Sequence, residues 1–86
     1  PEHWEEDDGL PGVMATLGAE ELLELIRALP IGFRIVFNLY AIEGYSHKEI
    51  AHLLGIRESA SRSQLTRARK QLAQAVAKAQ KVNFRA

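Results

Sequence analysis

The sequence contains no cysteine and no long apolar run. The lack of cysteine excludes disulfide frameworks and thiolate sites for zinc or iron–sulfur clusters, and it favours a reducing compartment such as the cytoplasm. No apolar stretch approaches the roughly 18 residues of a membrane-spanning helix. The opening Pro1 to Trp4 does not resemble a signal peptide, and because the chain begins without methionine we expect a fragment of a longer protein.

What the chain does contain is enough for one small domain. Its 86 residues are 47% hydrophobic and 26% charged, which is typical of a globular protein and unlike the composition of disordered chains. A chain of this length supports a single core. We therefore expect one folded domain and exclude a multidomain enzyme.

The net charge of zero conceals a strong asymmetry along the chain. Residues 1–24 hold eight acidic residues and no Lys or Arg, whereas residues 25–86 hold all eleven Lys and Arg residues and three acidic ones, so the two parts carry charges of −8 and +8. Such sorting indicates an acidic arm beside a basic surface that meets phosphate. The alternative is an ordinary solvated surface, and the positions of the charges must decide between them.

The acidic, glycine-containing residues 1–18 show no periodicity and are predicted to be a linker from a missing N-terminal domain. The folded domain is predicted to cover residues 19–80, followed by a frayed tail over residues 81–86. Apolar residues at helical spacing predict four helices, which cover residues 19–28, 31–43, 47–54 and 58–79. The second of these helices carries two apolar stripes, one of which contains Ile35, Leu39 and Ile42. Because it is apolar on most sides, it is expected to be central to the core.

The third and fourth helices form the pattern that points to function. Ser46 and Glu49 form a capping box, which begins the third helix near Ser46, and Gly55 ends it. We expect Ile50, Leu53 and Leu54 to face inward. A short helix, a glycine turn and a second helix rich in Arg, Ser, Thr and Gln constitute the helix-turn-helix arrangement, and the small Ala51 allows the two helices to cross closely.

The fourth helix has an outward face made of small, hydroxylated and basic residues. On a helical wheel drawn at about 100° per residue, an apolar seam runs through Leu65, Ala68 and Leu72. Two basic residues, Arg62 and Arg69, flank this seam. The outward residues are Ser59, Ser63, Thr66, Arg67 and Lys70. Short side chains allow close approach to base edges in a major groove, while Arg and Lys pair with guanine or phosphate. Such residues are usually solubilising, but their place in a helix-turn-helix favours nucleic-acid binding.

Ordered motifs along the chain resemble region 4, the C-terminal domain of bacterial sigma factors of the extracytoplasmic-function type. The resemblance covers residues 19–77 and is carried by Leu29-Pro30, Glu43-Gly44-Tyr45-Ser46, Glu49-Ile50-Ala51, Leu54-Gly55-Ile56 and Arg67-Ala68-Arg69. It implies an all-α fold: a four-helix domain with a C-terminal helix-turn-helix, of the winged-helix-like or sigma region 4 architecture and without strands.

The resemblance also implies a function and a set of contacts. The domain would read the −35 promoter element on double-stranded DNA as part of an alternative sigma factor, and would dock on the β-subunit flap of the RNA polymerase core. An anti-sigma protein could be a further partner. The residues that would reach bases are Ser59, Arg62, Ser63, Thr66 and Arg67. The candidates for phosphate contacts are Tyr45, His47, Lys48, Arg57, Arg69 and Lys70.

The sequence departs from the family pattern at the start of the fourth helix. Arg57 stands where Ser or Pro is common, and Ser59-Ala60-Ser61 stands near the usual Gly-Thr-Val. Ser61 falls on the apolar seam where valine is usual. We expect this substitution to lose part of one buried side chain, at a cost of roughly 1 kcal/mol or more.

Other functions have less support. A DNA-binding domain of the LuxR type also ends in a helix-turn-helix, but it lacks the closing Arg-Ala-Arg. A protein-interaction module with a basic helix is a further alternative. Catalysis and metal binding are not expected, because His47 and His52 are five residues apart rather than four and no second Glu-x-x-His arm accompanies Glu49 and His52. No cofactor is predicted.

Overall fold

The computed structural model describes residues 17–85, and it describes side chains for residues 17–80. The described elements are α2 (Ala19–Arg27), α3 (Ile31–Phe37), η2 (Asn38–Ile42), α4 (His47–Leu54) and α5 (Glu58–Arg85). Residues 17–85 contain no strand, which confirms the all-α prediction. Apart from Leu17 and Gly18, the predicted linker over residues 1–18 lies outside the described residues.

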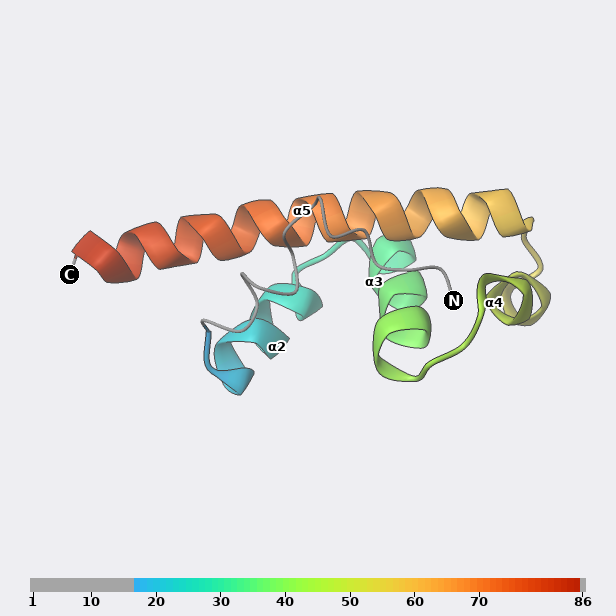
Figure 1. Cartoon of the computed structure of the whole chain (residues 1–86), viewed down its shortest axis with the longest axis horizontal. Coiled ribbons are helices and arrows are strands. Elements are labelled where there is room, and N and C mark those ends of the chain that lie inside the picture. The colour runs from blue at the N-terminus through green and yellow to red at the C-terminus, as the bar shows by residue number, and fades with distance from the viewer. Residues whose placement is uncertain (1–16, 86) are drawn as a thin grey trace.

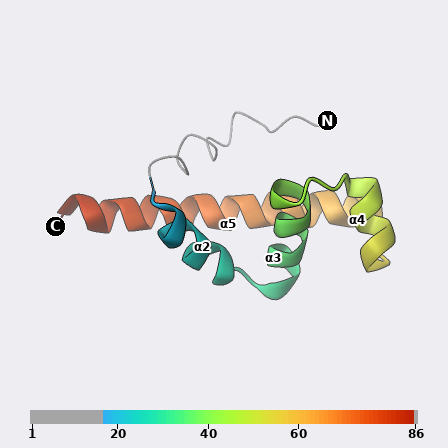
Figure 2. The ribbon, with the colours of Figure 1, turned by 90° about the horizontal axis from the view of Figure 1, so that it is seen from below.

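The fold is organised around α5. This 28-residue helix is about 42 Å long at 1.5 Å per residue. In Figure 1, α2, α3 and α4 all lie on one side of it, and Figure 2 shows them following one another along it, with α4 at its N-terminal end. The prediction that residues 31–43 form the central helix was therefore wrong. The long helix can contact all the others, whereas the short α3 spans only two turns.

Helix α5 continues to Arg85, beyond the end near Ala79 that periodicity predicted. Residues 80–85 lack the apolar spacing of the preceding turns, which is why the sequence indicated a frayed end there. They contain no Gly or Pro, so no residue breaks the hydrogen-bond ladder.

The core lies between α5 and the three helices beneath it. It is formed by one apolar stripe of α5 and one face of each neighbour. Its buried residues are Ile26 and Leu29 at α2, Val36 and Phe37 in α3, Ile50 in α4, and Leu65, Ala68, Leu72 and Val76 in α5. Leu65, Ala68 and Leu72 form the seam predicted from the sequence, and Val76 continues it by one turn.

Two predicted inward faces are exposed instead. Leu53 and Leu54 of α4 are 56% and 39% exposed. Ile35 and Ile42 are also exposed, so one of the two apolar stripes predicted for residues 31–43 is largely uncovered. Periodicity identifies apolar positions but does not say how many faces have a neighbour, and each of these short helices packs mainly through one face.

A π-helical turn replaces the last part of the predicted second helix. The Glu43 N–H donates to the Asn38 carbonyl at 2.9 Å, and the Tyr45 N–H donates to the Leu39 carbonyl at 2.9 Å. The wider turn changes the direction of its side chains relative to those of α3. Gly44 then adopts a left-handed conformation with φ of 85°, which glycine takes without a steric penalty where a helix ends.

The start of α4 matches the sequence prediction residue by residue. The Glu49 N–H donates to the Ser46 hydroxyl at 3.1 Å, and the Ser46 N–H donates to the Glu49 carboxylate at 2.8 Å. This reciprocal pair satisfies two backbone donors that the helix would otherwise leave without partners. The capping box is confirmed, and it sets where the helix-turn-helix begins.

Arg34 ties α3 to the end of α2. Its Nη1 donates to the Arg27 carbonyl at 2.8 Å, where a cation also complements the negative end of the α2 dipole. We expect Arg34→Ala to lower the free energy of unfolding by about 1–2 kcal/mol, measured by urea denaturation. Arg27→Ala is the control, because it removes a neighbouring guanidinium but keeps the acceptor. Equal losses in both variants would contradict the capping role.

Candidate nucleic-acid interface

The turn between α4 and α5 has the geometry of a helix-turn-helix. Gly55 caps α4 in a left-handed conformation with φ of 69°, which glycine adopts without a steric penalty. The Ala51 carbonyl accepts from the Gly55 N–H and from the Ile56 N–H, the latter at 3.0 Å. The Ser61 N–H then donates to the Arg57 carbonyl at 3.0 Å, which closes the first turn of α5.

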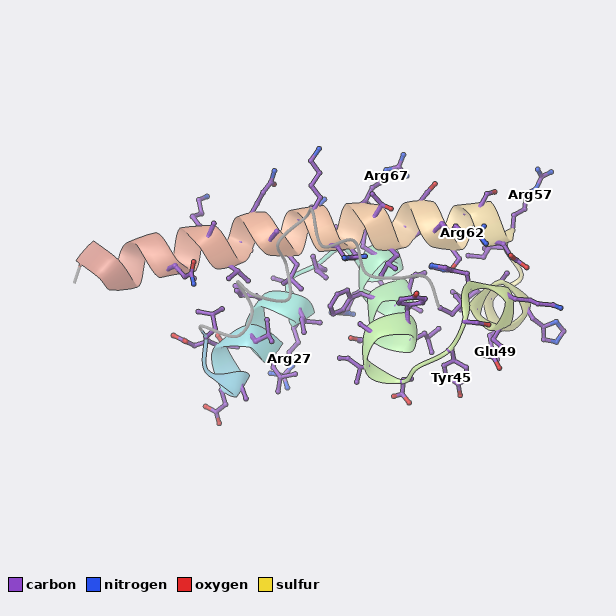
Figure 3. All side chains as sticks on the ribbon, viewed as in Figure 1. Arg27, Tyr45, Glu49, Arg57, Arg62 and Arg67 are labelled. Carbon is purple, nitrogen blue, oxygen red and sulfur yellow. The ribbon has the colours of Figure 1, made fainter. Side chains whose placement is uncertain are left out.

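The side of α5 that faces away from the other helices carries the predicted outward face. All five residues that the wheel placed outward are exposed, as are Arg57 and Arg62; the five are Ser59, Ser63, Thr66, Arg67 and Lys70. Figure 3 shows Arg57 and Arg67 projecting from the same side, opposite α3. The structure thus brings short hydroxylated side chains and exposed cations onto one accessible surface. We call this surface the basic face, and its residues are Arg57, Ser59, Ser63, Thr66, Arg67 and Lys70.

Arg62 lies beside the basic face in an ion pair. Its Nη2 is 3.2 Å from Glu58 Oε1, one turn earlier, and both side chains are largely exposed. Exposed pairs at this spacing contribute only about 0.3–0.5 kcal/mol. Arg62 can therefore exchange Glu58 for a base or phosphate at little cost, which keeps it available as a DNA contact.

His47 and Arg69, both candidates for phosphate contacts, are buried. Each side chain is 7% exposed. His47 Nδ1 lies 2.8 Å from the Ser61 hydroxyl, and its ring stacks on Tyr40 with centroids 4.4 Å apart. The spacing of His47 and Ile50, three residues apart on one face of α4, could have indicated burial. The wheel placed Arg69 at the edge of the seam, and the structure places it inside.

Ser61 is fully buried, as predicted for a seam residue. The sequence predicted only a loss of apolar packing at this position. The structure adds that its hydroxyl has a polar partner, His47, on the facing helix. That hydrogen bond offsets part of the cost of burying a hydroxyl group.

Tyr45 and Lys48 complete the set of predicted phosphate contacts. Both are exposed. Figure 3 shows Tyr45 and Glu49 projecting on the side opposite Arg57 and Arg67. The structure therefore does not bring Tyr45 together with the basic face.

The segment from Arg57 to Gln80 carries a strongly positive net charge. Residues 57–80 hold six Lys and Arg residues and one acidic residue, Glu58. No group of three or more His, Cys, Asp or Glu side chains within the described residues could hold a metal ion. None of the helices in residues 17–85 is both long and apolar enough to cross a membrane.

The comparisons with known proteins agree with this geometry. The family model described as "Sigma-70, region 4" matches residues 19–72, more than half of the chain and the part that contains α2 to α4 and the first half of α5. The searches of curated proteins and of solved structures found no significant match. The chain therefore belongs to the sigma-70 region 4 family, the promoter-binding and polymerase-associated domain of sigma factors.

Proposed function

We propose that this chain is the C-terminal domain of an alternative sigma factor of the extracytoplasmic-function type, and that it reads the −35 promoter element with α5. The observation that carries this proposal is the exposed basic face on the second helix of the helix-turn-helix. A sigma factor acts on promoter DNA together with RNA polymerase, so the chain would work in the bacterial cytoplasm.

The chemistry of the basic face suits a major groove. Ser59, Ser63 and Thr66 are small enough to let the helix backbone approach the bases, and their hydroxyls donate or accept. Arg67 on the basic face and Arg62 beside it both have the forked guanidinium geometry that pairs with guanine. Arg57 and Lys70 lie at either end of this set, and together with Lys48 on α4 they supply exposed cations for phosphate oxygens.

Exposed apolar side chains on the other helices supply a second surface, for the polymerase. Leu23 of α2 and Ile31, Ile35 and Ile42 of the α3–η2 segment are exposed. Figure 3 shows these helices on one side of α5 and Arg57 and Arg67 of the basic face on the other. A domain that holds DNA with one side and polymerase with the other needs such an arrangement, and we assign this surface to the β-subunit flap. An anti-sigma protein with an acidic surface would compete with DNA for the basic face.

Arg67→Ala tests the assignment of the basic face. The measurement is fluorescence anisotropy of the protein with two DNA duplexes, one carrying a −35 element of the extracytoplasmic-function type and one with a scrambled sequence. If Arg67 pairs with a base, the variant should lose about 1–3 kcal/mol of binding free energy on the promoter duplex and less on the scrambled one. A loss that is equal on both duplexes indicates a phosphate contact.

Arg27→Ala is the matched control for this experiment. It also removes one exposed guanidinium and changes the net charge equally, but Figure 3 shows Arg27 on α2, away from the basic face. Its affinity for both duplexes should stay close to that of the wild type. Equal effects of the two substitutions would contradict reading by α5. An absence of DNA binding by the wild type at low salt would favour the protein-interaction alternative.

A further inference from the structure

A polar contact lies inside the otherwise apolar seam of the helix-turn-helix. His47 is the first residue of α4, Ser61 is in the first turns of α5, and Tyr40 is in η2. The His47 Nδ1 and the Ser61 hydroxyl are 2.8 Å apart and buried, and the His47 ring stacks on Tyr40 at an interplanar angle of 17°. One imidazole therefore joins three consecutive elements.

The surrounding residues are those of an ordinary core. Ile50 and Ala68 are fully buried, and Leu65 is 5% exposed. Apolar contacts hold helices together but tolerate small rotations and sliding, because they have little directional preference. A hydrogen bond has a preferred distance and angle. The bond between His47 and Ser61 therefore adds a directional constraint to the contact between α4 and α5.

The position of Ser61 relates this constraint to the basic face. At about 100° per residue, two residues along a helix are separated by roughly 160° around its axis. Ser59 and Ser63 are each two residues from Ser61, so both point outward when Ser61 points toward His47. Rotation of the first turns of α5 would break the buried bond and turn these two serines away from the duplex.

We propose that His47 is a positioning residue for DNA reading. Through its hydrogen bond to Ser61 it sets the rotation of the start of α5 relative to α4, and this rotation determines the direction in which the basic face points. This inference rests on the proposed function. It gives His47 a role in DNA binding that requires no contact with phosphate.

The experiment compares variants that break the bond from either side. His47→Phe keeps an aromatic ring for the stack on Tyr40 but loses Nδ1, and Ser61→Ala loses the hydroxyl. The double variant H47F/S61A removes both partners. His47→Asn is the conservative variant, because it places a polar atom near the position of Nδ1. Affinities for the promoter and scrambled duplexes are measured at a temperature where circular dichroism shows every variant to be folded.

Ser46→Ala is the control for stability alone. It removes the cap of α4, next to His47 in sequence, without touching the contact with α5. It should lower the urea midpoint and leave the ratio of the two affinities unchanged. A loss of promoter preference in the bond variants then cannot be attributed to a weaker fold.

Each single bond variant should lose promoter preference by about threefold to tenfold, the effect of one net hydrogen bond. The effect of the double variant should be smaller than the product of the single effects, because both substitutions remove the same bond. His47→Asn should recover much of the preference. Wild-type preference in Ser61→Ala would overturn the positioning role.

A wild type that does not distinguish the duplexes would overturn the proposed function instead. The positioning role is then measured without DNA, by nuclear Overhauser effects between α4 and the first turns of α5. These should change in Ser61→Ala and not in Ser46→Ala. If the nuclear Overhauser effects of Ser61→Ala match those of the wild type, the positioning role of His47 is overturned, whatever the DNA-binding result.

Discussion

Phe37→Ala is expected to unfold much of the domain near physiological temperature. Phe37 is 1% exposed and is the last residue of α3, directly before the π-helical turn, and it belongs to the core that includes residues of α5. Truncation of a buried phenylalanine costs about 3–5 kcal/mol through lost transfer free energy and the cavity left behind. A domain of 86 residues has a stability of roughly 4–13 kcal/mol in total. We therefore expect Tm to fall by more than about 15 °C, as followed by circular dichroism.

Phe33→Ala is the matched control, because it makes the same chemical change one turn earlier in α3. Phe33 is only partly buried, where it packs against the core. We expect it to cost less than half as much as Phe37→Ala, since its environment can relax and water already reaches part of the ring. Comparable losses for the two variants would show that Phe37 does not have the central place in the core that the structure gives it.

DNA binding by this domain is expected to weaken steeply as salt rises. Three exposed cations are assigned to phosphates of the duplex: Lys48, Arg57 and Lys70. With a slope of about −0.9 per phosphate contact in a plot of log K against log salt, three contacts predict a loss of roughly 40-fold in affinity between 50 mM and 200 mM salt. Fluorescence anisotropy of one duplex over this range measures the slope directly.

Arg57→Gln distinguishes this electrostatic origin from a change in fold. Arg57 lies just before α5, and Figure 3 shows its side chain on the same side as Arg67. Its loss should reduce the magnitude of the slope by about one on both promoter and scrambled duplexes. Arg27→Gln on α2 should leave the slope unchanged. A slope near zero for the wild type would rule out phosphate contacts by the basic face.

Local signals predicted the elements of the fold well. The capping box at Ser46 and Glu49 acts within one turn, so the start of α4 does not depend on the rest of the chain. The left-handed glycines Gly44 and Gly55 end their elements for equally local reasons. The π-helical turn over Asn38–Ile42 was missed, because it depends on how the end of α3 meets α4 and has no spacing of its own in the sequence.

The sequence correctly predicted the exposed side chains of the candidate site but not the buried ones. Ser59, Ser63 and Arg67 are exposed because they lie opposite an apolar stripe, and a helical wheel contains that information. His47 and Arg69 are polar, and their types suggest the surface. Their burial follows from the packing of α3, η2 and α4 against α5, which no single helix encodes.

By itself, the sequence determined the helical class, the helix-turn-helix, the family and the composition of the basic face, since each follows from residue types at fixed spacings within one or two helices. Only the tertiary structure decided that α5 is the axis of the fold, that Tyr45 faces away from Arg57 and Arg67, and that His47 bonds to Ser61. These features depend on which faces of different helices meet, and that outcome reflects the packing of all the helices together rather than the pattern of any one.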